Sequence, residues 1–136
     1  MIALVSVAGL ASACGGSRLE MRIYDPSGNA KPEVATPDFI RRSARAIRFS
    51  GQSMLSLRLT DTGAKKFKNL TRILARRGAR LHRMQAIAFE VDGHTYARAP
   101  IDYRLSPNGF DGSSGIEFSA VPPKVARRLA KKIRGS

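Results

Sequence analysis

The sequence is poor in the residues on which most enzyme and metal sites depend. Its 136 residues include one cysteine, two histidines and no tryptophan. A single cysteine cannot form an internal disulfide. His82 and His94 stand at an expected strand start and an expected turn, and they offer no nucleophile-base pair with Cys14. Asp92 and His94 alone are too few ligands for a metal ion. We therefore expect a protein that is not an enzyme, with no metal and no cofactor.

Acidic residues are also scarce. The chain has 10 Asp and Glu residues against 24 Lys and Arg residues, which gives a net charge of +14. An excess of this size indicates an acidic partner, such as nucleic acid, anionic lipid or an acidic polymer. Nucleic acid binding would require a cytoplasmic location, and the exposed aromatic residues that commonly stack on bases are lacking. We expect no nucleic acid partner; the exception would be a cytoplasmic protein that retains residues 1–14.

The sequence has no stretch of about 20 apolar residues, the length that spans a membrane. Its first fourteen residues are uncharged, small and apolar, and they end at Cys14. The run is typical of the apolar core of a secretory signal, in which Ala11 and Ala13 form an Ala-x-Ala cleavage site. With Leu10 before it and Cys14 after it, the segment resembles a bacterial lipoprotein signal whose cysteine is lipidated. A plain secretory signal and a buried strand or helix are the alternatives.

The location of the protein follows from this signal. Lipidation of Cys14 would anchor the chain to the cell membrane on its extracytoplasmic side, and residues 15–18 would form a short tether. A plain secretory signal would instead give a secreted protein. Of the two, we expect the lipid-anchored form.

Residues 54–136 consist of two halves that end alike, each with an apolar strand, a helix start and a basic amphipathic helix. The first strand alternates leucine with polar residues, at Leu55, Leu57 and Leu59. Thr60 or Asp61 is a typical helix cap. The helix that follows has residues for a buried stripe at three- and four-residue spacing, namely Ala64, Phe67, Thr71 and Leu74. Gly78 is the expected end of this helix.

The second half repeats this pattern. Ile116 and Phe118 share one face of a strand, and Pro122 and Pro123 favour the first turn of a helix. The apolar stripe of that helix comprises Ala126, Leu129, Ala130 and Ile133. Gly135 is expected to end it.

The segment between the two helices predicts a β-hairpin. A strand over 84–91 is followed by Asp92 and Gly93, which favour a tight primed turn, and by a return strand through Tyr96. The loop at 107–115 is rich in turn formers but lacks the Gly-Lys-Ser/Thr ending of a phosphate-binding loop. We expect it to be a flexible hairpin connection into the strand at 116–118.

Residues 19–53 are expected to form a strand, a turn and a second strand that lead into the repeated unit. Apolar and charged residues alternate over 19–23, and residues 25–28 are turn formers. Asp38 is predicted to cap a short helical turn through Phe39 and Ile40, and the second strand is predicted to begin at Ala44.

Residues 54–136 resemble the head subdomain of the first periplasmic domain of SecD, from the SecDF protein-export complex. That family has a Thr-x-x-Gly-Ala-Lys-x-Phe helix start, a strand into Asp-Gly, an Ala-Pro after the return strand and a final Thr-Pro helix. The matching residues are Thr60, Gly63, Ala64, Lys65, Phe67, Thr71, Asp92, Gly93, Ala99, Pro100, Ser119, Pro123, Ala126, Leu129, Ala130, Arg134 and Gly135. The stretch from Asp92 to Pro100 is one residue longer than the family pattern, which predicts a bulge in the return strand.

The order of elements and the resemblance together predict the fold. Strand, helix, strand, strand, strand and helix imply an α+β fold with an antiparallel sheet and two helices packed on one face, akin to a ferredoxin-like sandwich. The resemblance further implies a protein that binds or guides polypeptides during export, with exported polypeptides or Sec channel components as partners. An open strand edge is expected to accept the polypeptide, with Leu55, Leu57 and Leu59 or Thr95, Tyr96 and Ala97 as the candidate positions.

Basic residues on the two helices suggest a second hypothesis. If both helices cover the same side of the sheet, their outer faces form one positive surface that would meet an anionic membrane surface. The candidate contact residues are Lys65, Arg72, Arg76, Lys124, Arg127, Arg128 and Lys131. The alternative function is therefore a basic envelope-binding module for anionic lipid or polymer, with no role in export.

Overall fold

The structure, a computed structural model, describes residues 18–119 and 121–135. The predicted signal at 1–14, its Cys14 and residues 15–17 of the tether lie outside the described residues. The described part contains β1 (Met21–Tyr24), β2 (Val34–Ala35), the 3-10 turn η1 (Thr36–Asp38), β3 (Phe39–Phe49), β4 (Gln52–Leu59), α2 (Asp61–Leu81), β5 (Gln85–Val91), β6 (His94–Ile101), β7 (Ile116–Ser119) and α3 (Pro123–Arg134).

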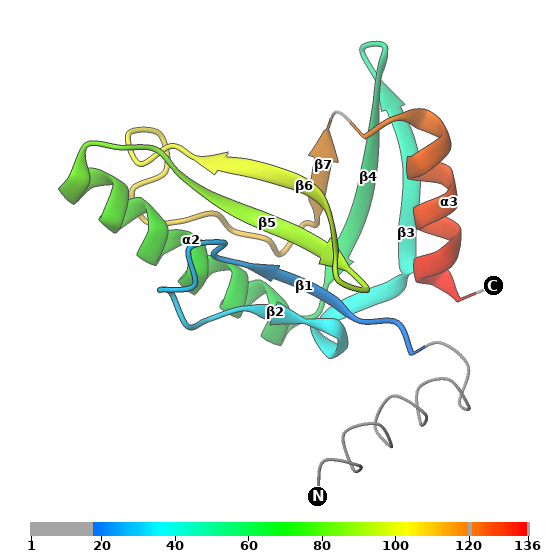
Figure 1. Cartoon of the computed structure of the whole chain (residues 1–136), viewed down its shortest axis with the longest axis horizontal. Helices are drawn as coiled ribbons and strands as arrows, with labels where there is room; N and C mark the ends of the chain where they lie inside the picture. The colour runs from blue at the N-terminus through cyan, green and yellow to red at the C-terminus, as the bar shows by residue number, and fades with distance from the viewer. Residues whose placement is uncertain (1–17, 120, 136) are drawn as a thin grey trace, which may run out of the picture.

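The strands form two antiparallel sheets (Figure 1). One has the order β2-β1-β5-β6 and the other the order β3-β4-β7. The predicted α+β class, with antiparallel strands and two helices, is confirmed, but the strands are divided between two sheets instead of sharing one. The segment 19–53 supplies strands to both, because β1 pairs with β5 and β3 pairs with β4.

Each helix packs on a different sheet. Helix α2 runs along the four-stranded sheet and contacts β5 and β6, whereas α3 contacts β3 and β4. The buried side chains of both sheets and both helices nevertheless belong to one core, which includes Ile23, Leu57, Leu74, Phe89 and Leu129. Because the helices do not share a sheet, the expectation that their outer faces form a single positive surface is not met.

Helix α2 begins as predicted and ends later than predicted. The backbone N–H of Gly63 donates to Thr60 Oγ1 at 3.0 Å, so Thr60 is the N-cap. The helix continues through Gly78 to Leu81 and ends at His82, which has a positive φ of 51°. The prediction that Gly78 ends the helix is wrong. A Cβ on Gly78 would lie 2.8 Å from the carbonyl oxygen of Arg83, so this glycine permits close packing.

Helix α3 matches its predicted bounds. Pro122 is the N-cap residue and Gly135, with a φ of 82°, is the C-cap. The predicted stripe is buried at Ala126, Leu129, Ala130 and Ile133. The first turn contains no acidic residue, and the last turn carries Lys131, Lys132 and Arg134, which favours the helix dipole.

The predicted hairpin at Asp92 and Gly93 is confirmed. Val91 pairs with His94 across the turn, and φ is 51° at Asp92 and 80° at Gly93. The predicted bulge in the return strand is also present, since the register shifts between Phe89 and Glu90 and leaves Tyr96 between their partners. Burial would raise the pKa of Asp92, but hydrogen bonds from the Glu20 N–H and from Lys132 hold it below its usual value.

Two loop predictions are wrong. Asp38 does not cap a turn through Phe39 and Ile40, because it is the last residue of η1 and β3 begins at Phe39. Its carboxylate instead accepts the N–H of Ala35, the N-cap residue of η1, at 2.9 Å and pairs with Lys66 at 3.0 Å. The loop at 107–115 is not a hairpin connection, because β6 and β7 belong to different sheets. It docks on α2, where the Phe110 N–H donates to Thr71 Oγ1 at 2.8 Å.

Candidate polypeptide-binding edge

The first of the two predicted strand edges is closed. Strand β4 lies between β3 and β7 and is hydrogen-bonded on both sides. Its leucines face the core, where Leu55 and Leu57 have 0% exposure and Leu59 has 5%. The prediction that this strand offers an edge to a polypeptide is therefore wrong. The alternation of its sequence indicated a buried face correctly, but alternation carries no information about which strands lie on either side.

The second predicted edge is open. Strand β6 is the outer strand of the four-stranded sheet, and among the described strands it pairs with β5 alone. Thr95 is exposed, and Tyr96 and Ala97 are half-buried. The bulge at Tyr96 also twists this edge locally. These residues therefore lie on an edge strand, as predicted, and their contact with a polypeptide stays a prediction.

An apolar pocket adjoins this edge where the two sheets meet. It has a volume of about 250 Å³ and lies between the end of β6 and β7, with α2 and the 107–115 loop completing its wall. The side chains that line it include Phe67, Ile87, Ala99, Ile101, Phe110, Ile116 and Phe118. Sequence reasoning missed Phe110, because a loop of turn formers gave no sign of docking on a helix.

The wall of the pocket is apolar except at two acidic residues, Asp111 and Glu117. The Ser113 N–H donates to Asp111 Oδ1 at 3.0 Å, and this hydrogen bond holds the pKa of Asp111 below its usual value. Asp111 is therefore ionised at neutral pH. The pocket is suited to an apolar side chain, and its negative charges disfavour an acidic one.

The predicted basic contacts are distributed over both helices and are not brought together. Lys65, Arg72 and Arg76 lie on α2, whereas Lys124, Arg127, Arg128 and Lys131 lie on α3. All of them are exposed except Arg72, which is half-buried and donates to Asn69 Oδ1. Their contact with an anionic surface stays a prediction.

Within residues 18–119 and 121–135, no group of three His, Cys, Asp or Glu side chains could hold a metal ion. In the same ranges, no helix has the length and apolar character needed to cross a membrane.

Comparison with known proteins gives no match to a protein-family model or to a curated protein. Two solved structures do match. One is described as SecDF in a super-membrane-facing form, with a TM-score of 0.58 and 19% identity over 85% of this chain. The other is described as the membrane component SecDF that enhances protein export, with a TM-score of 0.57, 19% identity and the same coverage of this chain. The chain has a SecD-like fold.

The chain spans 18% of the first SecDF structure and 61% of the second. The likeness thus concerns one part of that protein. Most residues that carry the SecD resemblance in the sequence serve this fold: Thr60 caps α2, Gly93 forms a turn and Gly135 ends α3. Phe67, Ala99 and Pro100 differ from them, because these three residues line the pocket beside β6.

Proposed function

We propose that this SecD-like chain is a non-enzymatic module that binds an extended polypeptide segment along the edge of β6 during protein export. The observation that carries the proposal is the open edge of β6 next to an apolar pocket. In strand addition, main-chain hydrogen bonds supply affinity, and pockets for alternate side chains supply specificity. The edge and the pocket provide these two parts.

The pocket restricts the kind of segment that fits. Its volume of about 250 Å³ suits one large apolar side chain, and Asp111 and Glu117 disfavour acidic residues beside it. An exported polypeptide that has not yet folded exposes such apolar side chains on an extended backbone. The matching SecDF is described as enhancing protein export, which supports the same role for this chain.

The proposed location follows from the sequence. We place the chain on the extracytoplasmic side of the cell membrane, anchored through lipidated Cys14, where it would meet polypeptides or channel components of the Sec machinery. An anchor at the amino terminus would leave the edge of β6 free, because the chain enters the sheet at β1 and β5 separates β1 from β6. Secretion without an anchor is the alternative location.

Photo-crosslinking in cells tests the proposal. A photoreactive residue is introduced in place of Ala97 on β6 and, as a matched control, in place of Leu105, which is 79% exposed on the loop after β6 and does not line the pocket. Capture of exported polypeptides at position 97 and not at 105 is the expected result. Equal capture at both positions, or capture at neither, would contradict binding at the β6 edge.

A further inference from the structure

The β3–β4 hairpin has an unusual charge pattern. From Phe39 to Leu59 it contains no acidic residue, and its arginines are Arg41, Arg42, Arg45, Arg48 and Arg58. Edge strands commonly carry basic residues that prevent association with other sheets. That explanation accounts for the presence of positive charge, but it does not account for where these side chains lie.

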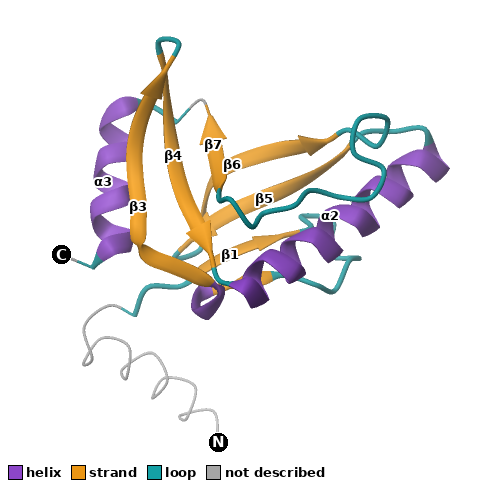
Figure 2. Ribbon diagram, turned by 180° about the vertical axis from the view of Figure 1, so that it is seen from behind, coloured by secondary structure: helices purple, strands orange, loops and turns teal. Residues whose placement is uncertain are grey.

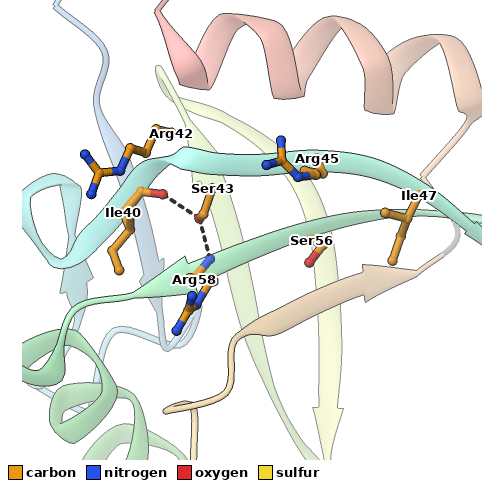
Figure 3. A pocket seen from close by; sticks show the side chains of 7 residues that line it. All are labelled: Ile40, Arg42, Ser43, Arg45, Ile47, Ser56 and Arg58. Atoms are coloured by element: carbon orange, nitrogen blue, oxygen red, sulfur yellow. Dashed lines mark hydrogen bonds between the residues drawn. The ribbon is translucent and has the colours of Figure 1, made fainter.

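Three of these arginines line a pocket at a bulge between the two strands. Ile40 pairs with Arg58 and Arg45 pairs with Ser56, so the four residues at 41–44 stand opposite Leu57 alone. The bulge opens a pocket of about 560 Å³, lined by Ile40, Arg42, Ser43, Arg45, Ile47, Ser56 and Arg58. Figure 3 shows Arg42 and Arg45 on β3, Arg58 on β4, and Ser43 hydrogen-bonded between the strands.

The bulge is held in place by hydrogen bonds from both sides. Ser43 Oγ donates to the Ile40 carbonyl at 2.5 Å and accepts the Arg58 N–H at 2.8 Å. Arg41 Nε donates to the Ile133 carbonyl at 2.9 Å, and Arg134 Nη1 donates to the Ala44 carbonyl at 2.6 Å. These last two bonds join the bulge to the end of α3. The backbone around the pocket is therefore fixed to α3 by hydrogen bonds.

The arginines that line the pocket are Arg42, Arg45 and Arg58. Among the residues that the structure describes, Arg42, Arg45 and Arg58 form no ion pair. The nearest acidic position in the sheet is Glu117 of β7, which stands opposite Ser56 and is exposed. Arginine binds phosphate through two parallel hydrogen bonds, and the Ser56 hydroxyl can donate another.

The same face of the hairpin becomes apolar toward its tip. Ile47 and Phe49 lie on the Arg45 side of β3, since alternate residues of a strand share a face, and Met54 stands opposite Ile47. Phe49 is 67% exposed. Helix α3 packs against the opposite face of β3 and β4, and neither helix covers the face that Figure 2 turns toward the reader.

We propose that this open face of the β3–β4 hairpin binds an anionic phospholipid surface, with a headgroup phosphate in the bulge pocket and Phe49 in the interfacial layer of the membrane. Basic and apolar side chains on one face are the combination by which proteins lie on anionic membranes. The proposal involves different residues from the helix surfaces expected from the sequence. It is also independent of polypeptide binding at β6.

Vesicle flotation tests the proposal with the full chain carrying Cys14→Ser, which cannot be lipidated. The chain with no further substitution serves as the reference. It is compared with the triple variant Arg42→Gln/Arg45→Gln/Arg58→Gln of the hairpin. The matched control is Lys65→Gln/Arg72→Gln/Arg76→Gln, which removes the same number of charges from α2. Vesicles of phosphatidylcholine with phosphatidylglycerol are compared with phosphatidylcholine alone. We expect the hairpin variant to bind anionic vesicles roughly a hundredfold more weakly and the α2 variant to bind nearly as well as wild type.

Two further measurements separate the lipid site from general charge attraction. Phe49→Ser leaves the net charge unchanged and is expected to weaken binding to anionic vesicles. Arg42→Lys/Arg45→Lys/Arg58→Lys keeps the charge but loses bidentate geometry, and it is expected to bind between wild type and the glutamine variant. Equal losses in the hairpin and α2 glutamine variants would overturn the proposal. If calorimetry shows that the protein binds inorganic phosphate but flotation shows no binding to vesicles, the pocket binds free phosphate and the proposed lipid site is wrong.

Discussion

The rings of Phe89 and Phe118 stack with their centroids 4.5 Å apart and an interplanar angle of 13°. Phe89 belongs to β5 and Phe118 to β7, so this contact joins the four-stranded sheet to the three-stranded sheet. Phe39 approaches Phe89 at 6.2 Å from the side of β3. An aromatic cluster therefore lies between the two sheets, and Phe118 also lines the pocket beside β6.

The first prediction concerns this cluster. Phe118→Ala should lower the free energy of unfolding by about 3–5 kcal/mol, because it leaves a cavity between the sheets. Phe49→Ala, at an exposed phenylalanine of the hairpin tip, should change it by less than about 0.5 kcal/mol. Urea unfolding followed by circular dichroism measures both values. Similar values for the two variants would mean that the sheets do not depend on this contact.

The signals that the sequence conveyed correctly are local. Thr60 caps a helix by bonding three residues ahead, Asp92 and Gly93 adopt the positive φ angles of their turn, and Gly135 ends α3. Each depends on a few consecutive residues, so its outcome can be inferred from them. The alternation of apolar and polar residues in β4 is also a local signal, and it correctly predicted that Leu55 and Leu57 are buried.

The errors concern contacts between distant segments. Nothing in residues 54–59 indicates that β3 and β7 lie on either side of β4, and nothing in 19–24 indicates that β1 pairs with β5. Gly78 has the composition of a helix end, but packing against the Arg83 backbone and the Tyr103 ring determines its role. The pocket beside β6 was missed for the same reason. Phe110 lines it because its backbone N–H donates to Thr71, which is 39 residues earlier in the chain.

The second prediction follows from a buried ion pair. Arg77 donates to both carboxylate oxygens of Asp25, whose side chain is 1% exposed, at 2.9 and 3.1 Å. Burial would raise the pKa of Asp25, but hydrogen bonds from Arg77 and from the N–H groups of Ala30 and Ser27 outweigh it and hold the pKa well below its usual range. Removing Arg77 as Arg77→Met should cost about 3–5 kcal/mol of stability, because an uncompensated charge stays buried.

The same pair predicts a pH dependence. The folded-state pKa of Asp25 lies below its unfolded value of about 4, so its contribution to stability is complete above about pH 4 and is lost as the pH falls further. Urea unfolding between neutral and strongly acidic pH should show this loss in the wild type and a smaller loss in Arg77→Met. A variant whose stability falls in acid as much as that of the wild type would contradict this assignment.

The third prediction concerns the loop that completes the pocket. Thr71 is fully buried, donates to the Phe67 carbonyl and accepts the Phe110 N–H. Thr71→Val should release the loop from α2 and weaken polypeptide binding, because Phe110 would no longer be held at the pocket. Thr62→Val, at an exposed position of the same helix, is the control. Hydrogen exchange at the Phe110 amide should rise in Thr71→Val alone; unchanged exchange would count against the role of this bond.

The central claim is that an extended polypeptide binds at the β6 edge with an apolar side chain in the adjoining pocket. The measurement that tests it most directly is fluorescence anisotropy of a labelled, uncharged extended peptide with one central phenylalanine, titrated with wild type, Phe110→Ser and Leu105→Ser. Wild type and Leu105→Ser should bind alike, and Phe110→Ser should bind roughly tenfold more weakly, because it removes an apolar wall of the pocket. Equal affinity of all three proteins, or no binding by wild type, would contradict the claim.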